Sequence, residues 1–171
     1  CIYRVLKADS GAVYLDGEEL YAMNAKSSAK KMAVVAQHNY YNFDFSAREV
    51  VLMGRAPHKK TLERDNAKDY QIVDEALKTV QMETFADRTF STLSGGEQQR
   101  VAIARALITS PAVIFADEPT GNLDAGSAET VAKMLSKASQ KYEQTIIMVT
   151  HDRQMADYAD RIITISDGQI Q

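Results

Sequence analysis

Residues 112–120, Ala-Val-Ile-Phe-Ala-Asp-Glu-Pro-Thr, form the stretch of the chain that decides the fold class. Its apolar run, 113–116, ends in two adjacent carboxylates, Asp117 and Glu118, and Pro119 then ends any strand. Three more short apolar runs lie at residues 32–36, 145–149 and 162–165. Near-continuous apolar character is typical of parallel strands that are buried on both faces. The four runs therefore predict strands of a parallel sheet.

Segments with helical spacing lie between these runs. Within residues 65–82, apolar residues recur at i, i+3, i+4 and i+7, at Val73, Ala76, Leu77 and Val80. A similar stripe within residues 125–142 comprises Val131, Leu135 and Ala138. A single apolar face is the pattern of a helix that packs on a core. Strands that alternate with helices predict an α/β fold.

The spacing of the strand candidates is uneven. No convincing strand occurs between Gln37 and Val113, and this stretch is too long for a single crossover. We therefore predict that residues 39 to about 91 form a helical subdomain inserted into the sheet domain. Asp-Gly pairs between apolar runs are strong turn signals. They predict two hairpins, one over residues 12–20 and one over residues 162–171.

The composition is that of an ordinary globular protein. A chain of 171 residues fits one domain, or one domain with a small insertion, and 45% apolar residues supply a sizeable core. The net charge of −3 gives no basic footprint for nucleic-acid binding. No apolar run approaches the roughly 18 residues of a membrane span, so a role at a membrane would need a partner. The lone Cys1, expected to be a small buried residue, fits a reducing compartment.

Polar side chains follow three of the strand candidates. Gln37 follows residues 32–36, the pair Asp117 and Glu118 follows residues 113–116, and His151 lies shortly after residues 145–149. Ligands of open α/β sheets bind at the carboxyl ends of the strands, so these groups predict a site there. Mg²⁺ is typically held by one or two carboxylates together with phosphates and water. The alternative is a pair of solvated acids at a strand end.

The sequence Leu-Ser-Gly-Gly-Glu-Gln-Gln-Arg at residues 93–100 predicts the start of a helix. Ser94 and Glu97 have the spacing of a capping box. Gly95 and Gly96 in the first turn cost roughly 1 kcal/mol each relative to Ala, and a helix meant only for packing would not contain both. Uncovered N–H groups at the positive end of a helix bind anions. These four residues therefore predict a phosphate site, with a simple helix cap as the alternative.

Together these motifs resemble those of the ABC ATPases. Residues 93–100 resemble the signature motif, 112–120 the Walker B strand and 122–124 the D-loop, while Gln37 and His151 match the Q-loop glutamine and the H-loop histidine. The motifs occur in the family's order and span essentially the whole chain. The resemblance implies a P-loop NTPase (RecA-like) parallel sheet with an inserted α-helical subdomain. Residues 1–38 and 92–171 would form the ATPase core, and residues 39–91 the helical subdomain.

The resemblance also implies roles at the catalytic edge, with ATP and Mg²⁺ as cofactors. Asp117 would order the water shell of Mg²⁺, and Glu118 would polarise the attacking water as general base. Gln37 would contact Mg²⁺ or that water and sense the membrane partner. His151 would contact the γ-phosphate.

The remaining implied roles concern partners. Ser94, Gly95 and Gly96 would bind the γ-phosphate of ATP held by a second subunit, in a head-to-tail homodimer with two shared sites. Asp124, grouped with these nucleotide-binding residues, would lie at the dimer interface. Transmembrane permease subunits, and through them a substrate-binding protein, would complete the transporter, with the ATPase at the cytoplasmic face of the cell membrane. No nucleic-acid partner is implied.

One departure from the family pattern concerns the phosphate-binding loop. The family's glycine-rich loop ends in Gly-Lys-Ser/Thr, and no such sequence occurs in the chain. Residues 1–10 resemble the helix and turn that follow that loop, so we expect the loop and its strand just upstream of Cys1. We favour truncation over natural absence of the loop. Residues 1–171 alone should then bind ATP poorly and not hydrolyse it.

The kind of transporter is less sharply indicated. Residues 54–58, Gly-Arg-Ala-Pro-His, resemble a segment of ATPases that power import of iron–siderophore complexes, haem or cobalamin, whereas residues 119–124 are closer to lipoprotein-release and macrolide-type exporters. We favour the importer and expect His58 to be an ordinary loop residue. A non-transport ABC ATPase and a non-catalytic binding or regulatory fragment are the rival hypotheses. For residues 98–100, a site role and a solvated helix face stay open.

Overall fold

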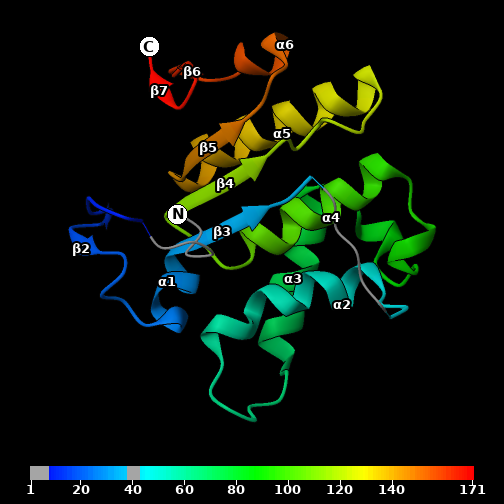
Figure 1. The fold of residues 1–171 in the computed structure, drawn as a ribbon. Helices are drawn as coiled ribbons and strands as arrows, with labels where there is room; N and C mark the ends of the chain where they lie inside the picture. The colour runs from blue at the N-terminus through cyan, green and yellow to red at the C-terminus, as the bar shows by residue number, and fades with distance from the viewer. Residues whose placement is uncertain (1–7, 38–42) are drawn as a thin grey trace.

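A three-stranded parallel sheet forms the centre of the protein (Figure 1). The computed structural model describes residues 8–37 and 43–171. Strands β3 (Met32–Val35), β4 (Val113–Asp117) and β5 (Thr145–Val149) lie in the order β3-β4-β5 and pair in parallel. Three of the four predicted strands and the α/β fold class are therefore confirmed. Cys1 and the start of the 1–10 segment lie outside the described residues.

The two faces of the sheet differ in burial. The face that contains Val35 and Ala116 packs against helices α4 (Gly95–Leu107) and α5 (Ala125–Tyr142), which lie behind the strands in Figure 1. On the other face Val34, Ile147 and Val149 are 37%, 44% and 54% exposed. The prediction of burial on both faces is wrong for β5, where side chains alternate in burial because the helices cover only one side.

The helices α4 and α5 begin at capping side chains. The hydroxyl of Ser94 caps α4, and the carboxylate of Asp124 caps α5 by accepting a hydrogen bond from the Ser127 N–H at 3.0 Å. Helix α5 has the predicted limits, and its predicted stripe is buried at Val131, Leu135 and Ala138.

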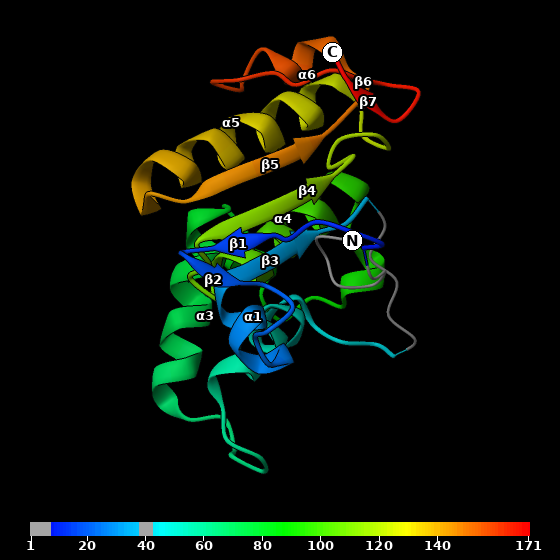
Figure 2. The same ribbon diagram turned by 60° about the vertical axis from the view of Figure 1, so that its left-hand side comes forward.

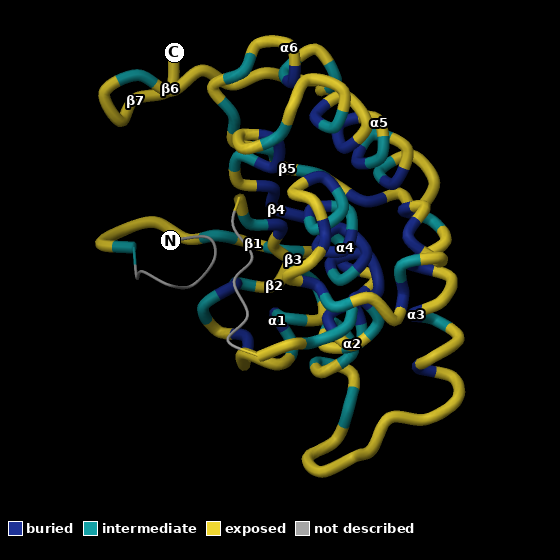
Figure 3. Tube along the Cα trace, turned by 90° about the vertical axis from the view of Figure 1, so that its right-hand side faces the viewer, coloured by how far each residue is buried: buried dark blue, intermediate teal, exposed yellow. Residues whose placement is uncertain are grey.

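The segment between β3 and α4 is helical where it is described. It contains α2 (Ala47–Leu52), α3 (Ala67–Thr79) and three 3₁₀ segments, η1 (Met53–His58), η2 (Glu83–Phe85) and η3 (Phe90–Thr92). Its described residues, 43–91, form no strand beyond an isolated bridge. The predicted stripe of α3 is buried. One core runs from α2 and α3 through α4 to the sheet, as the buried centre of Figure 3 shows, and the subdomain boundaries stay a prediction.

Both predicted hairpins are confirmed. Strands β1 (Tyr14–Leu15) and β2 (Glu18–Glu19) pair around Asp16 and Gly17, and β6 (Ile165–Ser166) and β7 (Gln169–Ile170) pair around Asp167 and Gly168. All four turn residues have φ between 51° and 78°, as a two-residue type I′ turn requires.

The prediction of a fourth parallel strand at residues 162–165 is wrong. Of these residues only Ile165 is in a strand, and it pairs in the hairpin, not in the sheet. Ile162 and Ile163 are 63% and 55% exposed. An apolar run indicates an extended segment but not its partner.

Two helices were not predicted. Helix α1 (Ala25–Lys31) begins at Asn24, whose side chain accepts from the Ser27 N–H, and lies beside the β1–β2 hairpin and β3 in Figure 2. Helix α6 (Arg153–Ala156) follows β5. Within residues 8–37 and 43–171, no helix has both the length and the apolar character needed to cross a membrane.

Candidate active site

The structure brings the predicted catalytic side chains to one edge of the sheet. Gln37 lies two residues beyond β3, Asp117 ends β4, Glu118 follows it, and His151 lies two residues beyond β5. Parallel pairing places the carboxyl ends of the three strands together. The expected clustering of these four residues therefore holds in the fold.

Glu118 has an unusual backbone. Its φ of 44° is in the left-handed region, which costs a non-glycine residue roughly 1–3 kcal/mol. The surroundings hold it there, since its N–H donates to Val149 O at 2.9 Å and its carbonyl accepts from the Gly121 N–H at 3.1 Å. This turn directs the side chain of Glu118 towards His151.

The side chains of Glu118 and His151 are in direct contact. Oε1 of Glu118 lies 2.8 Å from Nδ1 of His151 and accepts from the His151 backbone N–H at 3.1 Å. The hydrogen bond with Glu118, together with its charge, raises the pKa of His151 above its ordinary value. The His151 side chain is 84% exposed and that of Glu118 is 22% exposed. The pair is therefore fixed by its own contacts while one side stays open to a ligand.

Gln37 lies against the loop that follows Glu118. A Cβ atom built on Gly121 would lie 2.9 Å from Nε2 of Gln37 and 3.6 Å from Cβ of Glu118. An alanine at position 121 would therefore displace the Gln37 amide. Glu118, Gly121 and His151 also line a cleft of about 700 Å³ that continues along the start of α5 towards α6.

Asp117 is the candidate Mg²⁺ residue. It is exposed at the end of β4. In the part of the chain that the structure describes, no group of three or more His, Cys, Asp or Glu side chains could enclose a metal ion. A single exposed carboxylate beside Gln37 and Glu118 suits Mg²⁺, which keeps water and phosphate ligands. The residues therefore fit the ion.

The signature turn has the predicted capping box. Glu97 N–H donates to Ser94 Oγ at 3.4 Å, and Ser94 N–H donates to Glu97 Oε2 at 2.7 Å. Hydrogen bonds from the backbone N–H and the side chain of Ser94 to the Glu97 carboxylate lower the pKa of Glu97. The cap is confirmed.

The two glycines of this turn differ. A Cβ on the exposed Gly95 would meet only ordinary contacts, at 3.5 Å from Leu123 and 4.0 Å from Asn122 O. A Cβ on the buried Gly96 would lie 2.9 Å from Oγ and 3.1 Å from Cβ of Ser127. The argument that a helix meant for packing would not contain both glycines is therefore wrong for Gly96, because α5 approaches it closely.

Asp124 also has a structural role that was not predicted. It is the N-cap of α5, and hydrogen bonds from Ser127 lower its pKa. The preference of helix N-caps for Asp could have shown this. The signature turn lies against the D-loop at Asn122 and Leu123, and against Ser127 of α5. Its role at a dimer interface stays a prediction.

Gln98 and Gln99, which follow the signature turn, are not on a solvated face. Gln98 Nε2 donates to Phe90 O at 3.2 Å and to Leu93 O at 3.1 Å, and Gln99 Nε2 donates to Ala36 O at 3.3 Å. Gln99 is 4% exposed. It continues the buried stripe of Gly96 and Ile103, a spacing that could have identified it from the sequence.

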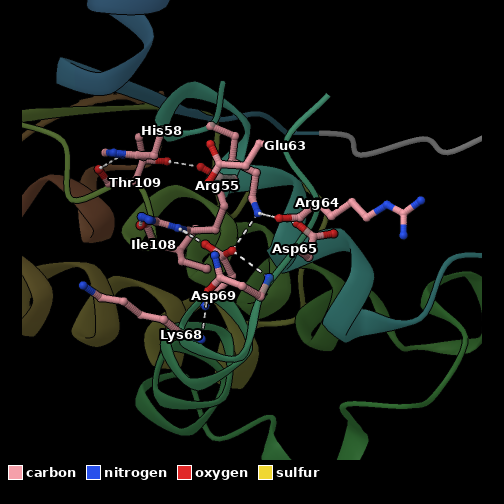
Figure 4. Close-up of polar contacts among 12 residues, drawn as sticks. Arg55, His58, Glu63, Arg64, Asp65, Lys68, Asp69, Ile108 and Thr109 are labelled. Atoms are coloured by element: carbon pink, nitrogen blue, oxygen red, sulfur yellow. Dashed lines mark hydrogen bonds and ion pairs between the residues drawn. The ribbon is translucent and has the colours of Figure 1, made fainter. Parts of the chain in front are cut away.

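The segment 54–58 is explained by contacts within the chain (Figure 4). Nε of Arg55 and Nζ of Lys59 lie 3.2 Å and 2.6 Å from the two oxygens of Asp69, at the start of α3. Nε2 of His58 lies 3.0 Å from Thr109 O, beyond the end of α4. A Cβ on Gly54 would lie 2.4 Å from the carbonyl oxygen of Arg105, so the site requires glycine. Residues 54–58 therefore pack between the start of α3 and the end of α4.

Comparison with known proteins decides the family. Residues 1–121 match the family model described as "ABC transporter". The chain belongs to the ABC transporter family. It is 36% identical to the petrobactin import ATP-binding protein FpuC of Bacillus anthracis, over 98% of this chain and 62% of that protein. It is 39% identical to the hemin import ATP-binding protein HmuV of Rhodococcus jostii, over 94% of this chain and 54% of that protein.

Other similar proteins include a subunit of a lipoprotein-releasing system and a cassette of known structure. The lipoprotein-releasing system ATP-binding protein LolD of Francisella tularensis is 37% identical, over 96% of this chain and 72% of that protein. The dimeric post-hydrolysis state of the ATP-binding cassette MJ0796, bound to ADP and Pi, superimposes with a TM-score of 0.77 at 32% identity, over 95% of this chain and 72% of that one. The fold is that of the ABC P-loop NTPases. This chain spans about half to two thirds of the length of the two import relatives.

Proposed function

We propose that the intact protein binds Mg·ATP and hydrolyses it to power an ABC transporter. The observation that supports this most strongly is the 2.8 Å contact between Glu118 and His151 at the edge that also holds Asp117 and Gln37. A carboxylate held in a strained turn against an imidazole, beside a second carboxylate, suits the activation of water in phosphoryl transfer.

Each residue of the edge has a distinct task in this proposal. Bound Mg·ATP supplies the reactive phosphoryl group and neutralises its charge. The carboxylate of Glu118 accepts the proton of the attacking water, and His151 holds that carboxylate in position. Asp117 would hold the ion through its water shell, and the Gln37 amide, which lies beside Gly121, would contact the ion or the water.

A second copy would complete the site in a head-to-tail homodimer. The turn at Ser94, Gly95 and Gly96 lies against the D-loop segment of its own chain, and Gly95 is exposed there. That placement leaves Gly95 open to the nucleotide of a partner. The similar MJ0796 cassette is dimeric, which supports a dimer here. Permease subunits would bind the dimer at the cytoplasmic face of the membrane.

The substrate class that we propose is an iron chelate, haem or cobalamin, taken up by an importer. The names of the relatives FpuC and HmuV, which specify petrobactin and hemin import, support it. The second candidate is lipoprotein release, which the 37% identity to LolD favours.

The activity is tested on the intact protein with Glu118→Gln. The substitution keeps size and hydrogen bonding but removes the base, so ATP hydrolysis should fall by roughly 10²–10⁴-fold. ATP affinity, measured by titration, should hardly change, and the ATP-bound dimer should accumulate. An equal loss of ATP binding would assign Glu118 to the metal shell or to the fold instead.

The substrate class is tested in the source cell with a chromosomal Glu118→Gln. Uptake of labelled ferric siderophore, hemin and cobalamin should fall for one of the three compounds while lipoprotein sorting stays normal. Retained lipoproteins with normal uptake of all three would favour the release system.

A further inference from the structure

The amide of Gln99 joins the signature helix to the strand that leads to Gln37. Gln99 is 4% exposed on α4, and its Nε2 donates to Ala36 O at 3.3 Å. Ala36 lies between the end of β3 and Gln37. The hydrogen bond therefore holds the backbone immediately before a predicted catalytic side chain.

Packing alone does not account for an amide at this position. Gln99 lies on the buried stripe of α4 between Gly96 and Ile103, where an apolar side chain would fill the same space. Burying an amide is unfavourable unless its polar atoms are paired. The partner of its Nε2 is a backbone carbonyl of β3's extension, so the position of that segment depends on α4.

The Gln37 side chain lies near the loop that follows Glu118. Nε2 of Gln37 lies 2.9 Å from the Cβ position of Gly121, and Cβ of Glu118 lies 3.6 Å from the same point. A shift of the backbone at Ala36 therefore changes where the Gln37 amide lies relative to the loop after Glu118.

The same helix begins at the signature turn. Gly95 lies four residues before Gln99, about 6 Å along the axis of a continuous helix. We propose that Gln99 is a positioning residue that couples the signature turn to Gln37. This inference rests on the proposed function: in a head-to-tail dimer the signature turn serves one site and Gln37 the other, so Gln99 connects the two sites.

The test uses the intact protein and single-turnover ATP hydrolysis, which remains measurable in slow variants. Gln99→Met keeps the length of the side chain and removes the amide. The hydrolysis rate should fall by at least about fivefold, the lower range of coupling between sites, while ATP affinity stays unchanged. If that variant does not fold, Gln99→Asn, which keeps the amide but cannot reach Ala36 O, makes the same comparison.

A double-mutant cycle with Gln37→Ala separates coupling from general damage. If Gln99 acts through Gln37, Gln99→Met should cause little further loss in the Gln37→Ala background. Gln98→Met is the matched control, because the Gln98 amide donates to Phe90 O and Leu93 O instead of to Ala36 O. Its effect should multiply with that of Gln37→Ala. Multiplying effects for Gln99 and Gln37, or an unchanged rate in a folded Gln99 variant, would overturn the inference. If the wild type does not hydrolyse ATP, the proposed function fails instead.

Discussion

Nδ1 of His151 lies 2.8 Å from Oε1 of Glu118, and the backbone N–H of His151 donates to the same oxygen. One oxygen of the Glu118 carboxylate thus accepts hydrogen bonds from both the backbone and the side chain of His151. The arrangement fixes the rotamer of Glu118 and links its position to the protonation state of His151.

The pKa of His151 should lie above 6.5 and should fall back towards that value in Glu118→Gln. The cause is the hydrogen bond with, and charge of, Glu118. Because the folded pKa is raised, the contact's stabilisation is fully present below about pH 6.5 and is lost as pH rises through the raised pKa. NMR titration of the imidazole in both proteins measures the shift. An unshifted value in the wild type would mean that the pair is not formed in solution.

Replacing Gly95 and Gly96 by alanine should have opposite effects on the stability of the fold. Gly95→Ala has room in the fold, so the free energy of unfolding should hold or rise by up to about 1 kcal/mol. ATP hydrolysis by the intact protein should nevertheless collapse, because the methyl group blocks the approach of a partner's phosphate.

Gly96→Ala is the matched variant of this pair. Its methyl group would meet Ser127, so the free energy of unfolding should fall by about 1–3 kcal/mol. Ser127→Gly should partly restore it. Denaturant unfolding and ATPase assays measure both effects. Full activity of Gly95→Ala would remove the phosphate role of this turn.

Mixing Gly95→Ala with Glu118→Gln subunits should restore part of the activity that each lacks alone. A shared site takes Glu118 from one chain and the signature turn from the other. In the mixed dimer, one site therefore has both lesions and the other has neither. Phosphate released in a single turnover should exceed the mean of the two parent proteins. A mixture no more active than that mean would argue against shared sites.

Replacing Asp69 by Asn should weaken the fold without touching the catalytic edge. Asp69 is paired with Lys59 and Arg55, and Lys59 above all lowers its pKa to about 2. At neutral pH the loss of these charge-assisted hydrogen bonds should cost roughly 1.5–3 kcal/mol in denaturant unfolding.

The same variant has a defined pH dependence. A lowered pKa gives stability that is present above the ordinary value of 3.8 and is lost as pH falls towards about 2. The difference between wild type and Asp69→Asn should therefore shrink over that window. A difference that is constant with pH would assign the effect to packing.

Much of the fold and several site residues follow from the sequence alone, because their determinants lie a few residues apart. The capping box of Ser94 and Glu97 spans four residues, the Asp-Gly turns span two, and α5 has its predicted limits. The polar residues after three apolar strands predicted a shared edge of the sheet, since parallel strands bring their carboxyl ends together. The catalytic role of that edge stays a prediction.

Only the tertiary structure decided the contacts between distant segments. Glu118 and His151 are 33 residues apart, and Gln99 and Ala36 are 63 apart. The approach of Ser127 to Gly96 and the one-sided burial of β5 likewise depend on where α5 packs. Local patterns specify which residues are extended, helical or capped, because the residues that form a cap or a tight turn lie within a few positions of each other in the sequence. Which face of an element is covered, and which polar groups meet there, is settled by packing that no short stretch of the chain contains.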